Sequence, residues 1–114
     1  MVSLIKDPED NDTHHLTKEQ KKIADAILDV MKVHDLTDTG GCRTFYTPQE
    51  WRDRGEQYGL RSELIVCHDG GDIQVAFNYD CMCYDVIEEV RVALDKIGYW
   101  AEPCTSWYTA IYKN

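Results

Sequence analysis

The sequence predicts an α+β fold: one domain with a mostly antiparallel sheet of four to five strands and about three helices. Three observations predict it: two helix-start motifs, a Gly-Gly turn between two apolar stretches, and two aromatic-rich stretches near the C-terminus. The predicted order is α-β-α-β-β-α-β-β, in which neighbouring strands are joined by short turns and therefore pair antiparallel. The chain of 114 residues has the length of one ordinary domain. We expect residues 14–114 to form that domain.

The first helix is predicted to begin after Thr17 and to end near His34. Thr17 and Gln20 have the spacing of a capping box, in which each side chain accepts a hydrogen bond from the other residue's backbone N–H. Residues 1–13 before it are polar and acidic, so we expect a mobile tail there. The apolar residues of the helix recur at helical spacing and form one stripe: Ile23, Ala24, Ile27, Leu28 and Met31.

A second capping box, formed by Thr47 and Glu50, predicts a helix over residues 48–58. Gly59 suits the position just after this helix, where the backbone often turns left-handed. The segment before the motif, residues 42–46, is short and apolar enough for a strand.

The middle of the chain has the pattern of a β-hairpin. An apolar strand is predicted over residues 63–68, and a turn with two glycines follows at 69–72. Apolar and polar residues then alternate over 73–78, which predicts a half-buried return strand.

A third helix is predicted over residues 83–97, because its apolar side chains again recur at helical spacing and Gly98 follows it. Two further strands are predicted over residues 99–101 and 107–112. We expect the helices to pack against one face of the resulting sheet.

The formal net charge of −9, from 21 acidic and 12 basic residues, excludes some functions. Such a surface repels nucleic acid, because binding its phosphates requires clusters of Lys and Arg. No stretch is apolar and long enough to span a bilayer, and the first residues lack the apolar region of a signal peptide. We expect a cytoplasmic protein with no direct nucleic-acid or membrane partner; a homo-oligomer remains an open alternative.

The cysteines suggest a second line of chemistry. An odd number of cysteines in a cytoplasmic protein predicts reduced thiols, not disulfides. Thiolates and imidazoles are the preferred ligands of zinc, but Cys81-Met82-Cys83 is one residue shorter than the usual pair and no second pair complements it. We therefore expect no metal and no cofactor. A small Cys/His-based enzyme or metal-binding protein is the alternative, with these candidate residues: Cys67, His68, Cys81, Cys83 and Cys104.

The acidic residues of the second half are the stronger candidates for a site. Between Asp69 and Glu102 there are eight acidic residues and only two basic ones. Along the third predicted helix the acids form a row about 15 Å long, and the turn before the helix adds two more. The predicted partner-binding residues are Asp85, Glu88, Glu89, Asp95, Asp69 and Asp72. The alternative interpretation is a solvated face that keeps the protein soluble.

Three stretches, residues 47–56, 68–72 and 104–108, are similar to small accessory proteins of bacteriophages and plasmids. The resemblance implies the cytoplasm of a bacterial host. Small acidic proteins of that kind often block CRISPR or restriction machinery at its nucleic-acid sites. The leading hypothesis is therefore a non-enzymatic inhibitor, of the anti-CRISPR or anti-restriction type. It would use its acidic residues as a DNA mimic against a basic, nucleic-acid-handling surface of a host defence protein.

Overall fold

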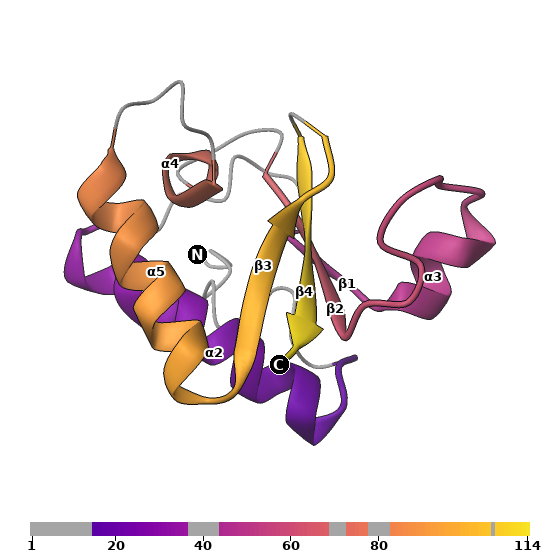
Figure 1. Cartoon of the computed structure of the whole chain (residues 1–114), viewed down its shortest axis with the longest axis horizontal. Coiled ribbons are helices and arrows are strands. Elements are labelled where there is room, and N and C mark those ends of the chain that lie inside the picture. The colour runs from indigo at the N-terminus through magenta and orange to yellow at the C-terminus, as the bar shows by residue number, and fades with distance from the viewer. Residues whose placement is uncertain (1–14, 37–43, 69–72, 78–82, 106) are drawn as a thin grey trace, which may run out of the picture.

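The computed structural model describes residues 15–36, 44–68, 73–77, 83–105 and 107–114, and this part of the chain forms four helices and four strands. The α+β class is confirmed, and the predicted tail over residues 1–13 lies outside the described residues. In chain order the elements of Figure 1 are α2 (Lys18–Val33), β1 (Phe45–Tyr46), α3 (Pro48–Asp53), β2 (Leu64–Cys67), α4 (Gln74–Phe77), α5 (Tyr84–Lys96), β3 (Tyr99–Pro103) and β4 (Tyr108–Lys113).

The four strands form one sheet in the order β1-β2-β4-β3, and every neighbouring pair is antiparallel. Leu64 of β2 lies opposite Ile111 of β4, and Trp100 of β3 lies opposite Tyr112 of β4. The two central strands are largely buried, which agrees with the continuous apolar stretch at Leu64–Cys67.

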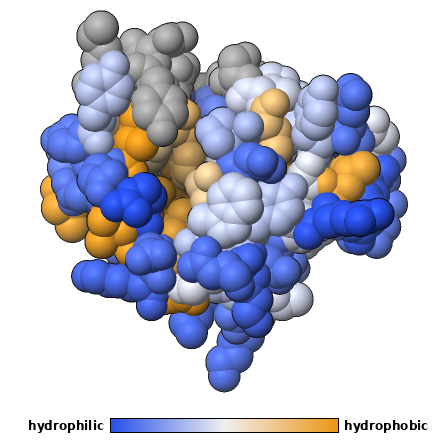
Figure 2. All heavy atoms as spheres, viewed as in Figure 1, coloured by the Kyte–Doolittle hydropathy of each residue, from blue (hydrophilic) through white to orange (hydrophobic). Residues whose placement is uncertain are grey.

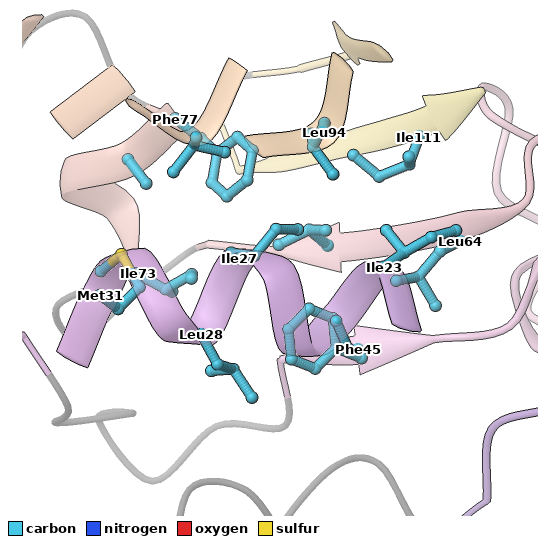
Figure 3. Close-up of a cluster of buried hydrophobic side chains, with 14 of the residues drawn as sticks. Ile23, Ile27, Leu28, Met31, Phe45, Leu64, Ile73, Phe77, Leu94 and Ile111 are labelled. Atoms are coloured by element: carbon cyan, nitrogen blue, oxygen red, sulfur yellow. The ribbon is translucent and has the colours of Figure 1, made fainter. Parts of the chain in front are cut away.

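Helices α2, α4 and α5 cover one face of the sheet. The predicted apolar stripe of α2 is buried along its whole length, and Figure 3 shows Ile23 and Ile27 pointing toward the sheet that carries Leu64 and Ile111. Leu94 of α5 joins the same cluster. Each of these large aliphatic side chains stabilises the fold by about 1.5–3 kcal/mol through burial.

Helix α3 lies on the opposite face, so the prediction that all helices share one face is wrong for this element. Trp51 of α3 is fully buried against Ile65, Tyr108 and Ala110. Alternate residues of a strand point to opposite faces, which is why Ile65 contacts Trp51 while Leu64 contacts the other layer. The sheet therefore has an aliphatic layer on one side and an aromatic layer on the other.

The predicted return strand over residues 73–78 is also wrong, because Gln74–Phe77 form the short helix α4; residue 78 lies outside the described residues. The buried residues of the described part, 73–77, are Ile73, Ala76 and Phe77, which are spaced i, i+3 and i+4 and so share one side of a helix. The alternation of Ile73, Val75 and Phe77 fits a strand equally well in sequence, but Val75 is only half-buried. The predicted turn at residues 69–72 lies outside the described residues.

Both predicted capping boxes are confirmed. Thr17 Oγ1 accepts a hydrogen bond from the Gln20 N–H at 3.1 Å, and Thr47 Oγ1 accepts one from the Glu50 N–H at 3.1 Å. Helix α3 ends at Asp53, five residues before the predicted end, because Gly55 takes a left-handed conformation with φ of 81° and stops the helix there. No helix in the described part of the chain has the length and apolarity needed to cross a membrane.

Candidate interaction surface on α2 and α5

The outer side of α2 and α5 carries an open groove. On each helix one stripe with the spacing i, i+3, i+4 and i+7 borders it. We define the α2–α5 groove by the residues that line it: Ala26, Asp29, Val30, Val33, Glu88, Glu89, Val92, Ala93, Lys96 and Ile97. Ala26, Val30 and Val33 lie outside the buried stripe of α2; the first two are half-buried and Val33 is exposed.

Two valines of the groove are exposed, Val33 strongly and Val92 to a lesser degree. Val33 is 79% exposed and Val92 is 37% exposed, whereas Val86 and Val90 of α5 are almost completely buried. In the space-filling view, hydrophobic surface lies between hydrophilic side chains on the side of the molecule occupied by α5 (Figure 2). Neighbouring exposed apolar side chains with a polar border are typical of interaction sites.

The border of the groove is acidic. Asp29 of α2 and Glu88 and Glu89 of α5 line it, and Lys96 is the one base among its lining residues. All four of these side chains are exposed. The groove therefore combines an apolar floor with a negative rim, which is complementary to an apolar segment that carries Lys or Arg.

The described site residues that were predicted on α5 border two different hollows. Glu88 and Glu89 border the α2–α5 groove, and Asp85 lies close to Glu89 at the same junction with α2. Asp95 instead lines a different hollow, on the side of α5 that faces β3. Asp69 and Asp72 lie outside the described residues. Glu88 and Asp95 are one heptad apart on α5, and Arg91 lies between them and interacts with both carboxylates.

Two of these acids have positively charged or titratable partners. Glu88 accepts hydrogen bonds from Arg91 Nε at 3.0 Å and from Arg91 Nη2 at 2.5 Å. The hydrogen bond from Arg91 lowers the pKa of Glu88, and the same contact raises the pKa of Arg91. Glu89 lies 2.9 Å from His34 Nε2 of α2. The basic side chain of Arg91 interrupts the predicted row of acidic side chains. This surface is therefore better described as mixed apolar and acidic than as a regular row of negative charge.

The second hollow lies between α5, α4 and β3 and has a volume of about 310 Å³. Phe77, Ile87 and Tyr99 contribute apolar walls, and Arg91 and Asp95 stand at its border. Trp100 also lines it and is 43% exposed.

The residues proposed for Cys/His chemistry form no group of three metal ligands in the described part of the chain, and Cys81 lies outside it. No disulfide joins Cys67, Cys83 or Cys104 in this part of the chain, and no group of three potential metal ligands among the described residues contains a cysteine. Burial raises the pKa of Cys104, which lowers its thiolate fraction at neutral pH. His68 is buried, stacks on Phe77 and lies 2.9 Å from Thr109 Oγ1. These contacts are those of a packed core histidine.

No protein-family model, curated protein or solved structure matches this chain. The evidence for function is therefore the arrangement of its own side chains.

Sequence reasoning did not identify the apolar half of the groove. Ala26, Val30 and Val33 are spaced i, i+4 and i+7, outside the stripe that was predicted to be buried. Helix α2 thus has more apolar positions than one contact with a sheet can cover, and that excess is the signal in the sequence. Val92 could not be assigned in the same way, because only the packing of α5 beside α2 shows which of its valines stay exposed.

Proposed function

We propose that this protein is a non-enzymatic binding protein whose α2–α5 groove takes up a basic, amphipathic helical segment of another protein. One observation carries the proposal: the exposed Val33 and Val92 lie in a groove whose border is formed by Asp29, Glu88 and Glu89. Apolar side chains of the partner would cover the valines, and Lys or Arg side chains would face the acidic border.

Both parts of the surface contribute to such binding. Burial of apolar area supplies about 25 cal/mol per Å², and helices that insert apolar side chains at i, i+3 or i+4 and i+7 into a groove are a common recognition mode. The acidic border mainly increases the association rate and favours basic partners over acidic ones. An isolated exposed valine needs no explanation, but Val33 and Val92 line the same groove.

The partner class follows from charge. Protein surfaces rich in Lys and Arg commonly hold nucleic-acid phosphates. We therefore propose that the partner is a nucleic-acid-handling protein and that occupation of its basic segment blocks access of DNA or RNA. An inhibitor of CRISPR or restriction machinery in a bacterial cytoplasm is the form of this proposal to test first.

A direct test uses a labelled helical peptide with Leu along one side and Lys and Arg along the other. We expect its fluorescence anisotropy to rise on titration with the protein, and the affinity to fall as salt is raised, because surface charges are screened beyond about 8–10 Å at physiological salt. The double variant Val33→Ser, Val92→Ser should weaken binding at least tenfold. Glu88→Lys with Glu89→Lys should mainly slow association and remove the salt dependence.

Asp53→Lys is the matched control, since Asp53 is exposed on α3, across the sheet from the groove. This variant reverses one charge, as Glu89→Lys alone does, and should leave binding of the peptide unchanged. Equal loss in Asp53→Lys and in the single variant Glu89→Lys would show that only the net charge matters, and the groove proposal would then be wrong. Burial of the groove in a homodimer would also prevent binding of the peptide. Sedimentation of the protein alone shows whether it is a monomer or a dimer.

A further inference from the structure

We propose that His34, Asp85 and Glu89 form a binding site for a divalent transition-metal ion of the zinc class. The potential ligand atoms of these three side chains lie within 4.8 Å of one another. Among the described residues this is the one group of at least three His, Cys, Asp or Glu side chains with that property. The inference does not depend on the proposed partner, because it concerns the isolated protein.

The fold brings the three side chains together from two helices. Asp85 and Glu89 are four residues apart on α5, so they lie on the same side of the helix, one turn apart. His34 is the C-cap residue of α2 and reaches across the junction to Glu89. The ligands therefore come from two elements whose packing against each other is fixed by the core.

The turn after α2 holds His34 in place. The Leu36 N–H donates to the Met31 carbonyl at 2.8 Å and the Asp35 N–H donates to the Lys32 carbonyl at 3.0 Å, which is the hydrogen-bond pattern of a Schellman motif. Asp35 has a φ of 59°, in the left-handed region that few residues other than glycine adopt. This well-defined helix end places the imidazole beside α5.

The donor set selects the class of metal. One imidazole and two carboxylates suit Zn²⁺ and its neighbours, whereas Mg²⁺ and Ca²⁺ favour oxygen ligands alone. In a tetrahedral zinc site with bonds near 2.0–2.1 Å, ligand atoms stand about 3.3 Å apart. The His34 Nε2 to Glu89 Oε2 distance is 2.9 Å, so small rotamer changes of exposed carboxylates produce that spacing. Three protein ligands leave the fourth position for water.

Electrostatics favour a cation at this point. Asp85 and Glu89 place two carboxylates beside one imidazole, and His34 can contribute at most one positive charge. Within the described residues, the identified ion pairs include Glu89 with His34 but none with Asp85. A divalent ion would neutralise both carboxylates, and binding would deprotonate the imidazole at the coordinating nitrogen.

The test is isothermal titration calorimetry of the full chain, purified without a histidine tag, with Zn²⁺. We expect one ion to bind at micromolar concentration. His34→Gln and Asp85→Asn should each weaken binding at least tenfold, while Glu88→Gln, which changes a neighbouring exposed carboxylate outside the group, should not. Substitution with Co²⁺ should give the intense visible absorption of a tetrahedral site, and His34→Gln should abolish it.

Circular dichroism should be unchanged in all three variants, since the side chains of Asp85 and Glu88 are exposed and His34 is only half-buried. Absence of zinc binding at submillimolar concentration would overturn the proposal. Binding that survives both His34→Gln and Asp85→Asn would also overturn it, because the metal would then be held elsewhere, for example by the cysteines or by His14 and His15. These outcomes are independent of peptide binding, which is measured with chelator present.

Discussion

The two faces of the sheet are closed in different ways. On the α3 face, Trp51 packs against Tyr46 and Tyr108, each with a ring-centroid distance of 4.9 Å, and the Arg54 guanidinium covers the indole at 4.5 Å. The α2 and α5 face is aliphatic and leaves Val33 and Val92 exposed at its outer side. Among the described residues, the α3 layer encloses its central indole with aromatic rings, whereas the α2 and α5 layer leaves two valines exposed on its outer side.

The largest expected effect comes from the closed aromatic layer. Trp51→Ala should lower the free energy of unfolding by about 3–5 kcal/mol, because a fully buried indole is replaced by a cavity. Trp100→Ala is the matched control: its indole is 43% exposed and stacks on Tyr112, so the loss should stay below about 1 kcal/mol. Urea denaturation measures both. Similar losses in the two variants would contradict the described packing of Trp51.

Two residues of α5 distinguish the buried side of this helix from its exposed side. Leu94→Ala should cost about 2–5 kcal/mol, since Leu94 is buried under the helix. Val92→Ala, two residues away on the exposed side, should change stability by no more than about 0.5 kcal/mol. The same denaturation curves test the pair. A large loss in Val92→Ala would mean that this valine already belongs to the core and is not available to a partner.

Two glycines with positive φ differ in the space around them. A Cβ at Gly59 would lie 2.8 Å from Ile65 Cδ1 and 3.1 Å from the Ala110 Cβ in the aromatic layer, and φ there is 80°. At Gly98, with φ of 91°, the added Cβ meets nothing within 4 Å. Gly98→Ala should therefore cost about 1–2 kcal/mol from backbone strain alone, and Gly59→Ala should cost more. Thermal unfolding measures both variants. Equal losses of stability in Gly59→Ala and Gly98→Ala would contradict the close packing around Gly59.

The smallest effect concerns the link between α2 and β3. The Tyr99 hydroxyl donates a hydrogen bond to the Glu19 carboxylate, which raises the pKa of Tyr99 to about 12 and lowers the pKa of Glu19. The tyrosine contribution to stability is present below pH 10, the ordinary value, and is lost as pH rises through about 12. The glutamate contribution is present at neutral pH and is lost as pH falls through the lowered pKa.

Absorbance titration of the phenols checks this link. Tyr99→Phe should remove one tyrosine that ionises near pH 12, and the alkaline loss of stability should become smaller. If the variant instead removes a phenol that titrates near pH 10, the hydrogen bond to Glu19 is absent in solution.

Local signals predicted most of the fold. The capping boxes at Thr17 and Thr47 act within four residues, so sequence alone locates both helix starts. The segment after the central turn could not be assigned in this way, because Ile73, Ala76 and Phe77 fit a helix while alternate apolar residues fit a strand. Its environment beside α5 decides between them. The face occupied by α3 is likewise decided by tertiary packing of Trp51.

The candidate site was predictable only in part. The acidic character of α5 and the i,i+3 spacing of Glu88 and Arg91 are evident in the sequence, but the hollow that each acid borders depends on how α5 packs beside α2 and β3. His34 is fifty-five residues from Glu89 in sequence, so no local pattern joins them. Contacts between distant residues require the packed structure.

Nuclear magnetic resonance mapping with the basic amphipathic peptide tests the central claim most directly. In a ¹⁵N-labelled sample, the amide signals of residues 26–33 and 88–97 should shift on titration, and those of α3 should stay in place. The Val33→Ser, Val92→Ser variant should lose these shifts while keeping its dispersed spectrum. Shifts centred on α3, or an unchanged spectrum at saturating peptide, would contradict the assignment of the α2–α5 groove as the binding surface.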